Sequence, residues 1–526
     1  MRLVYLKEGL GYTADAFKSC VLRQLDRQDE NASDGLNSGF LDRLRESINS
    51  EFDSAVVRDK GKNEFVFRYL GLYDYVDSKT GKNLTFFFAP KFINNEDWIS
   101  GFPQKGRDVV IQAIDRYNKE WTQISDQSEY VEKKHESILE IAVRFLRDYL
   151  ERGLYVVSHR ELELNGQGEI DWNSTIDTFQ PVIKRGRPYY MNVLTEQSYS
   201  DEDHYITRLQ KCLVTTWGKK LEDLGLSSVL RVNVPLLSEE KIEHFGDESF
   251  QVSQIDRELN VQFVTRARET LKLMRELIQR SSENQALNYE SLSFGLPGGE
   301  HLWETACADV LGSELDHEMR ACGFTKMPEG LKFSEYVPSP FWFHHECPDS
   351  VDSSGGVRGS EEAASRKLGW RLDFIRTCRT VGGSVDRLVI LDAKYYCVKW
   401  NGASISGQPG MADITKQIFY QMAFQGVIGN DEIVNAFLFP EDDSLDGVKG
   451  VKLVESVSLK SPSTSEKGDE PTEAFKDIKL FAIRLLALKL FEMYANAISG
   501  DAWFKRIIEF GKRIQEMSRR MNVRDK

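Results

Sequence analysis

The stretch DRLVILDAKYY, residues 386–396, places a carboxylate and an ammonium at the end of an apolar run. Residues two apart in a strand point to the same face, so Asp392 and Lys394 are expected to share a face with Ile390. A carboxylate there can hold a divalent metal ion, and a lysine beside it can orient a water molecule and offset negative charge. A surface hairpin with a salt bridge is the alternative interpretation, because an Asp-x-Lys pattern is common by chance.

A second aspartate lies in the preceding strand candidate, WRLDFIRTCRT, residues 370–380. Gly382 and Gly383 suit a two-residue hairpin turn between the two strands. With these glycines at the centre of the turn, Asp373 lies directly opposite Asp392, where Cβ atoms are about 4.5–5.5 Å apart. Two like charges at that separation repel each other unless a cation lies between them. The pattern therefore predicts a hairpin that binds a divalent metal ion such as Mg²⁺.

Two carboxylates and a lysine on one hairpin resemble the core of the PD-(D/E)xK nuclease site. In that chemistry Asp373 and Asp392 would bind one or two Mg²⁺ ions, with the carbonyl of Ala393 as a further ligand. The metal polarises the scissile phosphate and lowers the pKa of a bound water. Lys394 would orient that water and offset charge on the transition state.

A helix is predicted for HLWETACADVLG, residues 301–312, with Glu304 next to Trp303. A glutamate from the helix before such a hairpin commonly completes this type of site. Glu304 is therefore predicted as an added ligand of the metal or of its water. Taken alone, a solvated glutamate on a helix surface is the simpler interpretation.

A further helix is predicted after the hairpin, in ADITKQIFYQMAF, residues 412–424. Residues three and four apart lie on one side of a helix, which gathers polar side chains into a stripe. Beside a metal site, such a stripe could contact DNA phosphates without repelling them. An ordinary solvated helix face is the alternative. The predicted DNA-binding residues are Lys416, Gln417, Tyr420 and Gln421, in a stripe with Asp413 and Phe424, which leaves Ile418, Phe419, Met422 and Ala423 for the core.

The segment LPGGE, residues 296–300, divides the elements that must position these residues. We expect an α/β (α+β) fold, with a mixed N-terminal region at 1–285 and a PD-(D/E)xK nuclease domain at 286–526. The predicted upstream elements are strands at 63–76 and 84–92, helices at 107–121, 135–152 and 254–281, and a hairpin turn at Asn165-Gly166. Downstream, a core helix is predicted at 478–498 and flexible insertions at 348–366 and 458–471.

The composition is that of a globular protein without a general affinity for polyanions. Of 526 residues, 41% are hydrophobic and 29% are charged, and the net charge is −14, so DNA binding would depend on local patches. One such patch is the basic tail at 505–526, for which a solvated amphipathic helix is the alternative. Seven cysteines without a CxxC pair indicate reduced thiols. With neither a secretory signal nor a membrane span expected from the apolar patterns, we predict a cytoplasmic protein without membrane contact.

The stretch FWFHHECPD, residues 341–349, contains two histidines, a glutamate and a cysteine, which are residue types that bind zinc. Adjacent residues in a strand point to opposite faces, so these four make a poor tetrahedral set. We therefore do not expect zinc at His344, His345, Glu346 and Cys347.

Three stretches together resemble the LlaJI-type restriction endonuclease family, relatives of the McrC nuclease subunit: RLDFI, LVILDAKYY and DITKQIFYQMAF. The resemblance extends to the helix with Trp303 and Glu304, and to LRDYLERGLYVVSHRELELNGQGEIDWNSTI at 146–176. It implies a Mg²⁺-dependent DNA endonuclease subunit of a GTP-dependent restriction system.

The same resemblance implies a separate McrB-like AAA+ GTPase that recognises and moves the DNA that this subunit cuts. The sequence contains no GxxxxGK[ST] phosphate-binding loop, which agrees with an NTPase on another chain. By analogy, residues 1–285 would contact the motor through the region around Asn165–Ile176, where a purely structural hairpin is an equally open interpretation. Dimerisation through the nuclease domain is a further option. A stand-alone DNA repair or recombination nuclease, and a non-catalytic adaptor that stimulates a partner NTPase, remain as alternatives.

Overall fold

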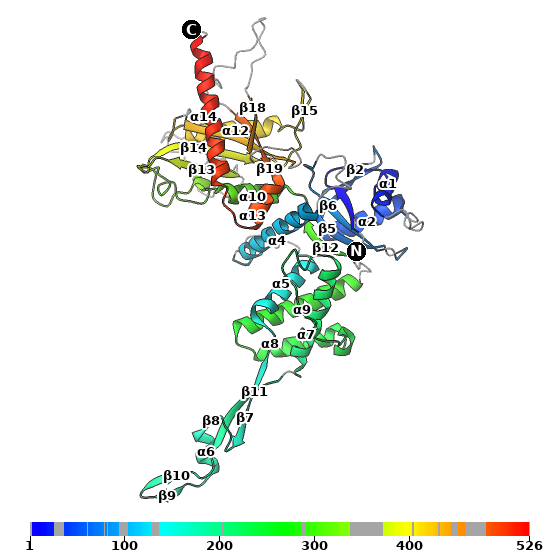
Figure 1. Ribbon diagram of the computed structural model, residues 1–526, viewed down its shortest axis with the longest axis vertical. Helices are drawn as coiled ribbons and strands as arrows, with labels where there is room; N and C mark the ends of the chain where they lie inside the picture. The colour runs from blue at the N-terminus through cyan, green and yellow to red at the C-terminus, as the bar shows by residue number, and fades with distance from the viewer. Residues whose placement is uncertain are drawn as a thin grey trace, which may run out of the picture.

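The chain is mixed α+β, as the sequence predicts, and it is elongated, with helix α14 (Asp501–Arg524) at one end and a β arm at the other (Figure 1). The computed structural model describes residues 3–25, 36–59, 61–77, 79–81, 83–93, 104–127, 136–201, 203–286, 291–336, 372–401, 404–429, 432–442, 451–457 and 480–524. Both predicted insertions, 348–366 and 458–471, and the rejected zinc ligands at 344–347 lie outside these residues.

The N-terminal region is built on a four-stranded sheet with the order β1 (Leu3–Lys7), β6 (Asn83–Ala89), β5 (Leu70–Val76) and β12 (Leu292–Leu296). Strand β1 runs parallel to β6, and the other neighbours are antiparallel. Strand β12 lies far along the chain from its partner β5. The predicted boundary at residue 285 therefore falls before a strand that belongs to the N-terminal sheet.

Two glycines allow β12 to close against β5. Gly71 and Gly295 are paired in register, and Gly71 has a φ of +129°. A Cβ atom on Gly71 would lie 2.6 Å from the Cα of Gly295, and one on Gly295 would lie 2.4 Å from the carbonyl oxygen of Leu70. Only glycine fits so close an approach of two backbones.

One face of the four-stranded sheet is covered by α1 (Ala14–Gln24) and α2 (Ser38–Glu51), as the shared apolar cluster shows. A smaller sheet of β2 (Gly11–Tyr12), β4 (Glu64–Phe67) and β3 (Val56–Asp59) packs into the same cluster. The predicted strand at 63–76 is thus two strands, β4 and β5, and the predicted strand at 84–92 is β6.

A helical body follows, formed by α4 (Gln104–Gln127), α5 (Ile138–Arg152), α7 (Tyr205–Asp223), α8 (Glu248–Val261) and α9 (Thr265–Ala286). Helices α4 and α5 confirm the helices predicted at 107–121 and 135–152. The single helix predicted at 254–281 is wrong, because the chain leaves α8 and turns back into α9. Apolar positions continue at helical spacing through this break, so periodicity alone could not show it.

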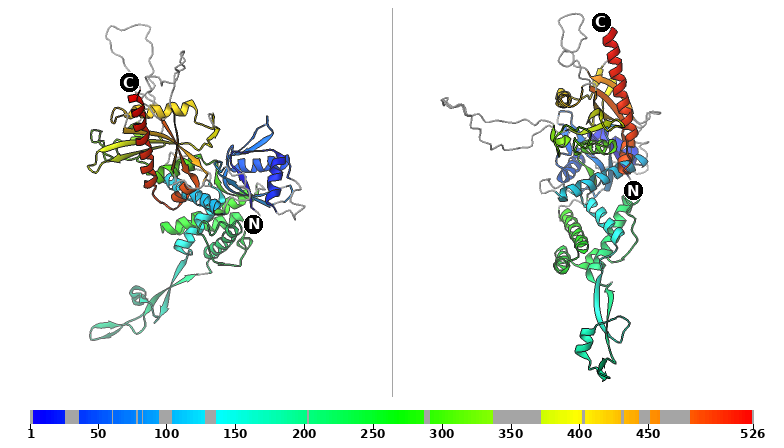
Figure 2. Two further views of the ribbon diagram at one scale, coloured as in Figure 1. Left: turned by 45° about the horizontal axis from the view of Figure 1, so that its top comes forward. Right: turned by 90° about the vertical axis from the view of Figure 1, so that its left-hand side faces the viewer.

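The arm, residues 157–201, projects from the helical body to the far end of the molecule (Figures 1 and 2). Its stem pairs β7 (Val157–Leu164) with β11 (Leu194–Asp201) along their full length. The turn predicted at Asn165-Gly166 is confirmed, with Asn165 at a φ of +53°, and β7 before it pairs with the much later β11. The arm also contains β8 (Glu169–Ile170), α6 (Trp172–Thr178), β9 (Val182–Lys184) and β10 (Arg187–Tyr189).

The C-terminal region is built on a five-stranded mixed sheet. Its order is β13 (Phe374–Arg379), β14 (Val385–Ala393), β17 (Ile433–Glu441), β19 (Leu480–Leu486) and β18 (Val451–Val457). The three central strands are parallel to one another, and each edge strand is antiparallel to its neighbour. Central parallel strands are covered on both faces, which agrees with their near-continuous apolar runs.

Helices lie on both sides of this sheet. Helix α12 (Met411–Phe424) covers one face, and α10 (Glu300–Leu311), α13 (Ala487–Ala495) and α14 lie against the other (Figure 2, right). The remaining short elements are α11 (Phe333–Tyr336), β15 (Lys399–Asn401) and β16 (Ser404–Ser406), together with a 3-10 turn at Ile242–Phe245.

The core helix predicted at 478–498 is wrong in its first half. Leu480–Leu486 is strand β19, between β17 and β18, and only the second half is helical, as α13. A short continuous apolar run is compatible with a buried strand or a buried helix, and only its neighbours in the sheet decide between them. Among the described helices, none has the length and hydropathy needed to cross a membrane.

Candidate active site

The β13–β14 hairpin has the register that the sequence predicts. Phe374 pairs with Leu391 and Ile375 with Ile390. Asp373 comes just before the first paired residue of β13, so the same register extended by one position brings it to Asp392, and Asp392 is among the causes that raise the pKa of Asp373. The predicted two-residue turn is wrong, however. Thr380 donates its backbone N–H to Ser384 at 2.9 Å around a three-residue loop, and the loop ends in Gly383 with a φ of +83°.

One bulged residue reconciles the longer turn with the predicted register. Arg379 pairs with Val385, whereas Cys378 pairs with Arg387, so Asp386 is an extra residue in β14. A three-residue loop alone would shift the pairing by one position. The bulge restores it, and the two aspartates remain opposite each other.

Strand alternation places Asp392 on the face covered by α12. Ile390 belongs to the apolar cluster with Tyr420 and Phe424 of α12, whereas Leu391 belongs to the cluster with Trp303 on the opposite face. Asp392 follows the pattern of Ile390, as predicted, and its side chain is 0% exposed. The carboxylate is therefore held inside the protein, between the sheet and α12.

The carboxylate of Asp392 is poorly satisfied by the described protein. The Nζ of Lys394 lies 2.9 Å from its Oδ2, and the Nζ of Lys416 lies 3.9 Å from its Oδ1. Neither oxygen accepts a hydrogen bond of regular geometry from any described residue. A buried carboxylate that lacks hydrogen bonds is costly. The arrangement fits a bound cation, because an oxygen-ligated metal ion would satisfy both oxygens.

Asp373 provides a second reason to expect a bound cation beside Asp392. Burial, and then the neighbouring Asp392, raise the pKa of Asp373; the charge of Lys416 opposes this rise, and the charge of Glu304 adds to it. Without a metal ion, the pair therefore tends to keep a proton, as two carboxylates that share a site do. With a divalent cation between them, both could be ionised.

Lys394 is fixed between two carboxylates. Its Nζ lies 2.9 Å from Asp392 and 3.1 Å from Oδ1 of Asp413. Burial acts to lower the pKa of Lys394, but the two carboxylates outweigh it, and the net pKa is raised. Sequence reasoning missed this role of Asp413. A signal was available, since Asp413 is the acidic residue in the first turn of α12, where a negative charge is favoured by the helix dipole.

Glu304 lies within electrostatic reach of the aspartate pair. Its charge contributes to the raised pKa of Asp373, and it also raises the pKa of the buried Cys307 thiol, after burial itself. The Glu304 carboxylate contacts Nδ1 of His301 at 3.4 Å and remains 39% exposed. Its neighbour Trp303 is buried and donates from Nε1 to the carbonyl of Leu438 in β17, at 3.4 Å.

Helix α12 is rotated relative to the expectation, which corrects the predicted DNA-facing stripe. Gln417, Tyr420 and Gln421 are at most 2% exposed and face the sheet, whereas Met422, expected in the core, is 51% exposed. Asn435 of β17 donates to Gln421 Oε1 at 3.2 Å, and to the backbone carbonyl of Gln417 at 2.9 Å. Asn435 thus ties the buried Gln421 side chain and the helix backbone to the sheet. Of the four predicted DNA-binding residues, Lys416 is the partly exposed one.

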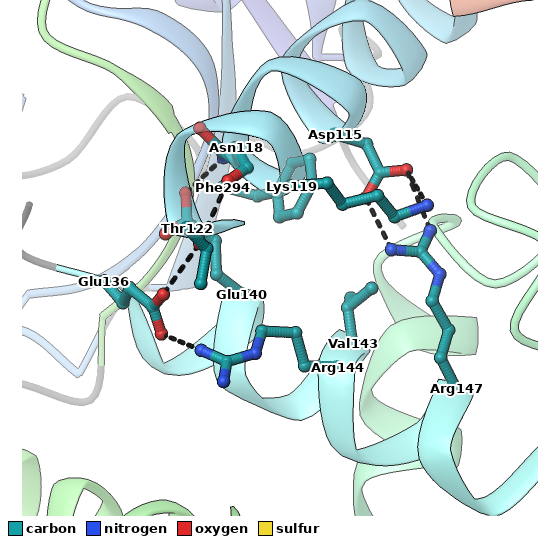
Figure 3. A pocket seen from close by; sticks show the side chains of 10 residues that line it. All are labelled: Asp115, Asn118, Lys119, Thr122, Glu136, Glu140, Val143, Arg144, Arg147 and Phe294. Carbon is teal, nitrogen blue, oxygen red and sulfur yellow. Dashed lines mark hydrogen bonds and ion pairs between the residues drawn. The ribbon is translucent and has the colours of Figure 1, made fainter. Parts of the chain in front are cut away.

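A separate hollow lies between α4 and α5 and has a volume of about 280 Å³ (Figure 3). It contains none of the predicted site residues. Its charges are matched, because Arg147 binds Asp115 at 2.7 Å and Arg144 binds Glu136 at 2.5 Å. No chemistry is assigned to this hollow.

Comparisons with known proteins agree with the sequence resemblance. The family model described as LlaJI restriction endonuclease matches residues 75–322 and 363–460. The type II restriction enzyme BsuMI component YdjA of Bacillus subtilis (strain 168) is 25% identical over 405 residues, which cover 75% of this chain and 76% of that protein.

Among solved structures, one match is the refined half-complex from a tetradecameric assembly of Thermococcus gammatolerans McrB AAA+ hexamers with bound McrC. It has a TM-score of 0.33 and 13% identity, and covers 94% of this chain and 99% of that chain. The two stretches matched by the family model contain Glu304, Asp373, Asp392 and Lys394.

Proposed function

Because the chain belongs to the LlaJI restriction endonuclease family, we propose that it is a Mg²⁺-dependent DNA endonuclease subunit with a PD-(D/E)xK site. The observation that carries the proposal is the fully buried Asp392 carboxylate, which lies beside Asp373 and has the ammonium groups of Lys394 at 2.9 Å and Lys416 at 3.9 Å, without a regular hydrogen bond from a described residue. A carboxylate pair buried in this way is costly, and a divalent cation between the two would offset that cost.

In the proposed mechanism, Asp373 and Asp392 would hold Mg²⁺, with the Ala393 carbonyl and Glu304 completing the set directly or through water. When bound there, the ion would supply polarisation of the phosphate and a lowered pKa of a coordinated water. Lys394 stays protonated and contributes positive charge next to the phosphate, and Asp413 holds it in position. The water oxygen would bond to phosphorus and give up a proton to solvent, the phosphorus–oxygen bond to one sugar would break, and the leaving sugar oxygen would take a proton from solvent.

Lys416 is the proposed contact to the DNA backbone. Its Nζ lies near Asp392, and its side chain is 27% exposed, so it can approach a phosphate at the edge of the metal site. The buried Gln417, Tyr420 and Gln421 would act indirectly, by fixing α12 against the sheet. This replaces the role that the sequence suggested for those three.

We further propose that the arm docks onto a McrB-like AAA+ GTPase. The arm exposes an unusual number of large apolar side chains for a solvated β structure, which marks an interaction surface. They include Leu162, Leu164, Trp172, Ile176, Val182, Ile183, Tyr189 and Met191, each at least half exposed. The predicted motor-binding region around Asn165–Ile176 lies within the arm.

The test is DNA cleavage by the full chain co-expressed with a McrB-like AAA+ GTPase, with and without GTP and Mg²⁺. Cleavage that needs all three supports the proposal. Asp392→Ala should abolish cleavage and leave GTPase stimulation intact. Asp386→Ala is the matched control, since this bulged aspartate of the same strand lies outside the site.

Other outcomes distinguish the alternatives. Cleavage by the chain alone would indicate a stand-alone nuclease. Stimulation of the GTPase without any cleavage would indicate a non-catalytic adaptor. Undiminished cleavage by Asp392→Ala would remove the proposed active site altogether.

A further inference from the structure

Three metal-binding side chains of different kinds meet in the segment between α10 and β13. Glu314, His317 and Cys322 each offer one ligand atom, and these atoms all lie within 4.8 Å of one another. Two and four residues separate them along the chain, which is the short spacing of natural zinc ligands. This cluster shares no residue with the proposed nuclease site.

The backbone that carries these side chains is already fixed. Glu314 donates its N–H to the carbonyl of Ile375 in β13 at 2.7 Å, and His317 donates to the Glu314 carbonyl at 2.9 Å. Cys322 donates to the Met319 carbonyl at 3.1 Å. A metal ion would thus bind a preformed arrangement and would lose little affinity to ordering of the chain.

Glu314 is held in place and still has room for a ligand. One oxygen accepts from the backbone N–H and the hydroxyl of Thr377, at 2.8 and 2.7 Å, and the other accepts from Arg379 at 2.9 Å. A carboxylate offers about four acceptor positions, and the Cys322 thiol also hydrogen-bonds to Glu314, so a metal ion would take the place of that thiol proton. The three contacts orient the carboxylate as outer partners of metal ligands do.

The other two metal-binding side chains are Cys322, on the buried side of the cluster, and His317, on its exposed side. The Cys322 side chain is buried, whereas His317 is exposed. Burial, and then the charge of Glu314, raise the pKa of the Cys322 thiol to about 11, with Arg379 opposing. The thiol therefore keeps its proton at neutral pH in the absence of a metal ion. A metal that binds the sulfur must displace that proton, and its affinity must fall as pH falls.

We propose that Glu314, His317 and Cys322 bind a zinc ion, with water as the fourth ligand on the exposed side. One sulfur, one nitrogen and one oxygen donor suit Zn²⁺, whereas Mg²⁺ requires oxygen ligands. The ion replaces the thiol proton, which passes to solvent. The ion would cross-link the segment after α10, whose Glu314 already accepts hydrogen bonds from Thr377 and Arg379 of β13, and so would support the hairpin without taking part in its chemistry.

The test uses the full-length chain and does not depend on DNA cleavage. Metal analysis after purification should find one zinc per chain, and Co²⁺ in its place should show thiolate-to-cobalt charge-transfer absorption. Cys322→Ser should lose that absorption and weaken Zn²⁺ binding by at least about 10-fold. Cys378→Ser, a half-buried cysteine of β13, is the matched control and should retain both.

A second variant keeps the proposal open to disproof should Cys322→Ser fail to fold. His317→Ala alters an exposed side chain and should leave the fold unchanged while it weakens Zn²⁺ binding. Absence of zinc from the wild-type chain together with no charge-transfer absorption would overturn the proposal. Equal absorption in Cys322→Ser and wild type would do the same.

Discussion

The protonation state of Lys394 depends on the two carboxylates beside it. It lies between Asp392 and Asp413, whose carboxylates together raise its pKa despite its burial. A lysine that stays protonated cannot serve as a general base, so its contribution must be electrostatic. Asp413 thus acts on the proposed reaction through Lys394, as a positioning residue.

Asp413→Asn should lower the pKa of Lys394, because one of the two carboxylates that raise it is lost. Lys394 would then lose its proton at a lower pH, and the alkaline limb of the pH profile of kcat should move to lower pH. We expect kcat at neutral pH to fall roughly 10-fold, with KM for DNA unchanged. Asp413→Glu should restore much of the activity. An equal loss at every pH would instead point to a purely structural role.

Asp373 makes stability depend on pH. Its pKa is raised by burial and by Asp392, so the folded state binds this proton more tightly than the unfolded state. Its contribution to stability is therefore present at low pH and is lost as pH rises through the raised pKa. Without divalent metal, the free energy of unfolding of the wild type should fall relative to that of Asp373→Asn as pH rises from the ordinary pKa of an aspartate to the raised pKa of Asp373. Urea unfolding of both proteins at several pH values measures the difference, and Mg²⁺ should stabilise the wild type only.

At the scale of elements, the β13–β14 hairpin positions the site through a turn and a bulge that compensate each other. The three-residue loop ends in Gly383, whose φ of +83° is strained for any residue with a side chain. The bulged Asp386 then restores the pairing. A slip by one residue would turn Asp392 to the opposite face of the sheet.

Gly383→Ala should reduce the free energy of unfolding by about 1 kcal/mol, because alanine is strained at this φ. No atom lies within 4 Å of the added methyl group, so the cost is conformational and not steric. Gly382→Ala is the matched control, since Gly382 does not have a positive φ and its Cβ would meet only ordinary contacts. Equal stability of the two variants, measured by denaturant unfolding, would contradict this account of the turn.

At the scale of the whole molecule, the N-terminal sheet contacts the strand that carries the candidate site. Glu8, just after β1, accepts hydrogen bonds from the Tyr395 hydroxyl at 2.8 Å and from the backbone N–H of Gly299 at 3.0 Å. Tyr395 directly follows Lys394, and the ammonium of Lys91 lies 4.2 Å from the centre of its ring. One apolar cluster also continues from the helical body into the C-terminal sheet. The N-terminal region is therefore packed continuously against the element that carries the candidate site.

The exposed apolar side chains of the arm should be required for stimulating the partner's GTPase but not for the stability of the fold. Ile183→Ser with Met191→Ser alters two side chains that are 65% and 80% exposed, so the free energy of unfolding should change by less than about 0.5 kcal/mol. Stimulation of the motor's GTPase should be lost. Phe263→Ser, at the equally exposed corner between α8 and α9, is the control and should retain it. Normal stimulation by the arm variant would exclude the arm as the docking element.

The sequence alone determined the features that depend on local geometry. The two-residue period of a strand placed Asp392 and Ile390 on one face, and closure of a hairpin placed Asp373 opposite Asp392. The family could also be identified from the sequence, because its motifs are short and contiguous. Even the wrong turn type left the pairing correct, since the bulge compensated for it.

Only the tertiary structure decided the features that depend on distant partners. Asn435 of β17 donates hydrogen bonds to the Gln421 side chain and to the backbone carbonyl of Gln417, which holds this side of α12 against the sheet, and an apolar periodicity cannot show this. The segment Leu480–Leu486 is a strand because β17 and β18 lie on either side of it. Strand β12 returns to the N-terminal sheet because Gly71 and Gly295 permit the close approach. In each case the free energy comes from contacts between segments remote in sequence, which no local pattern records.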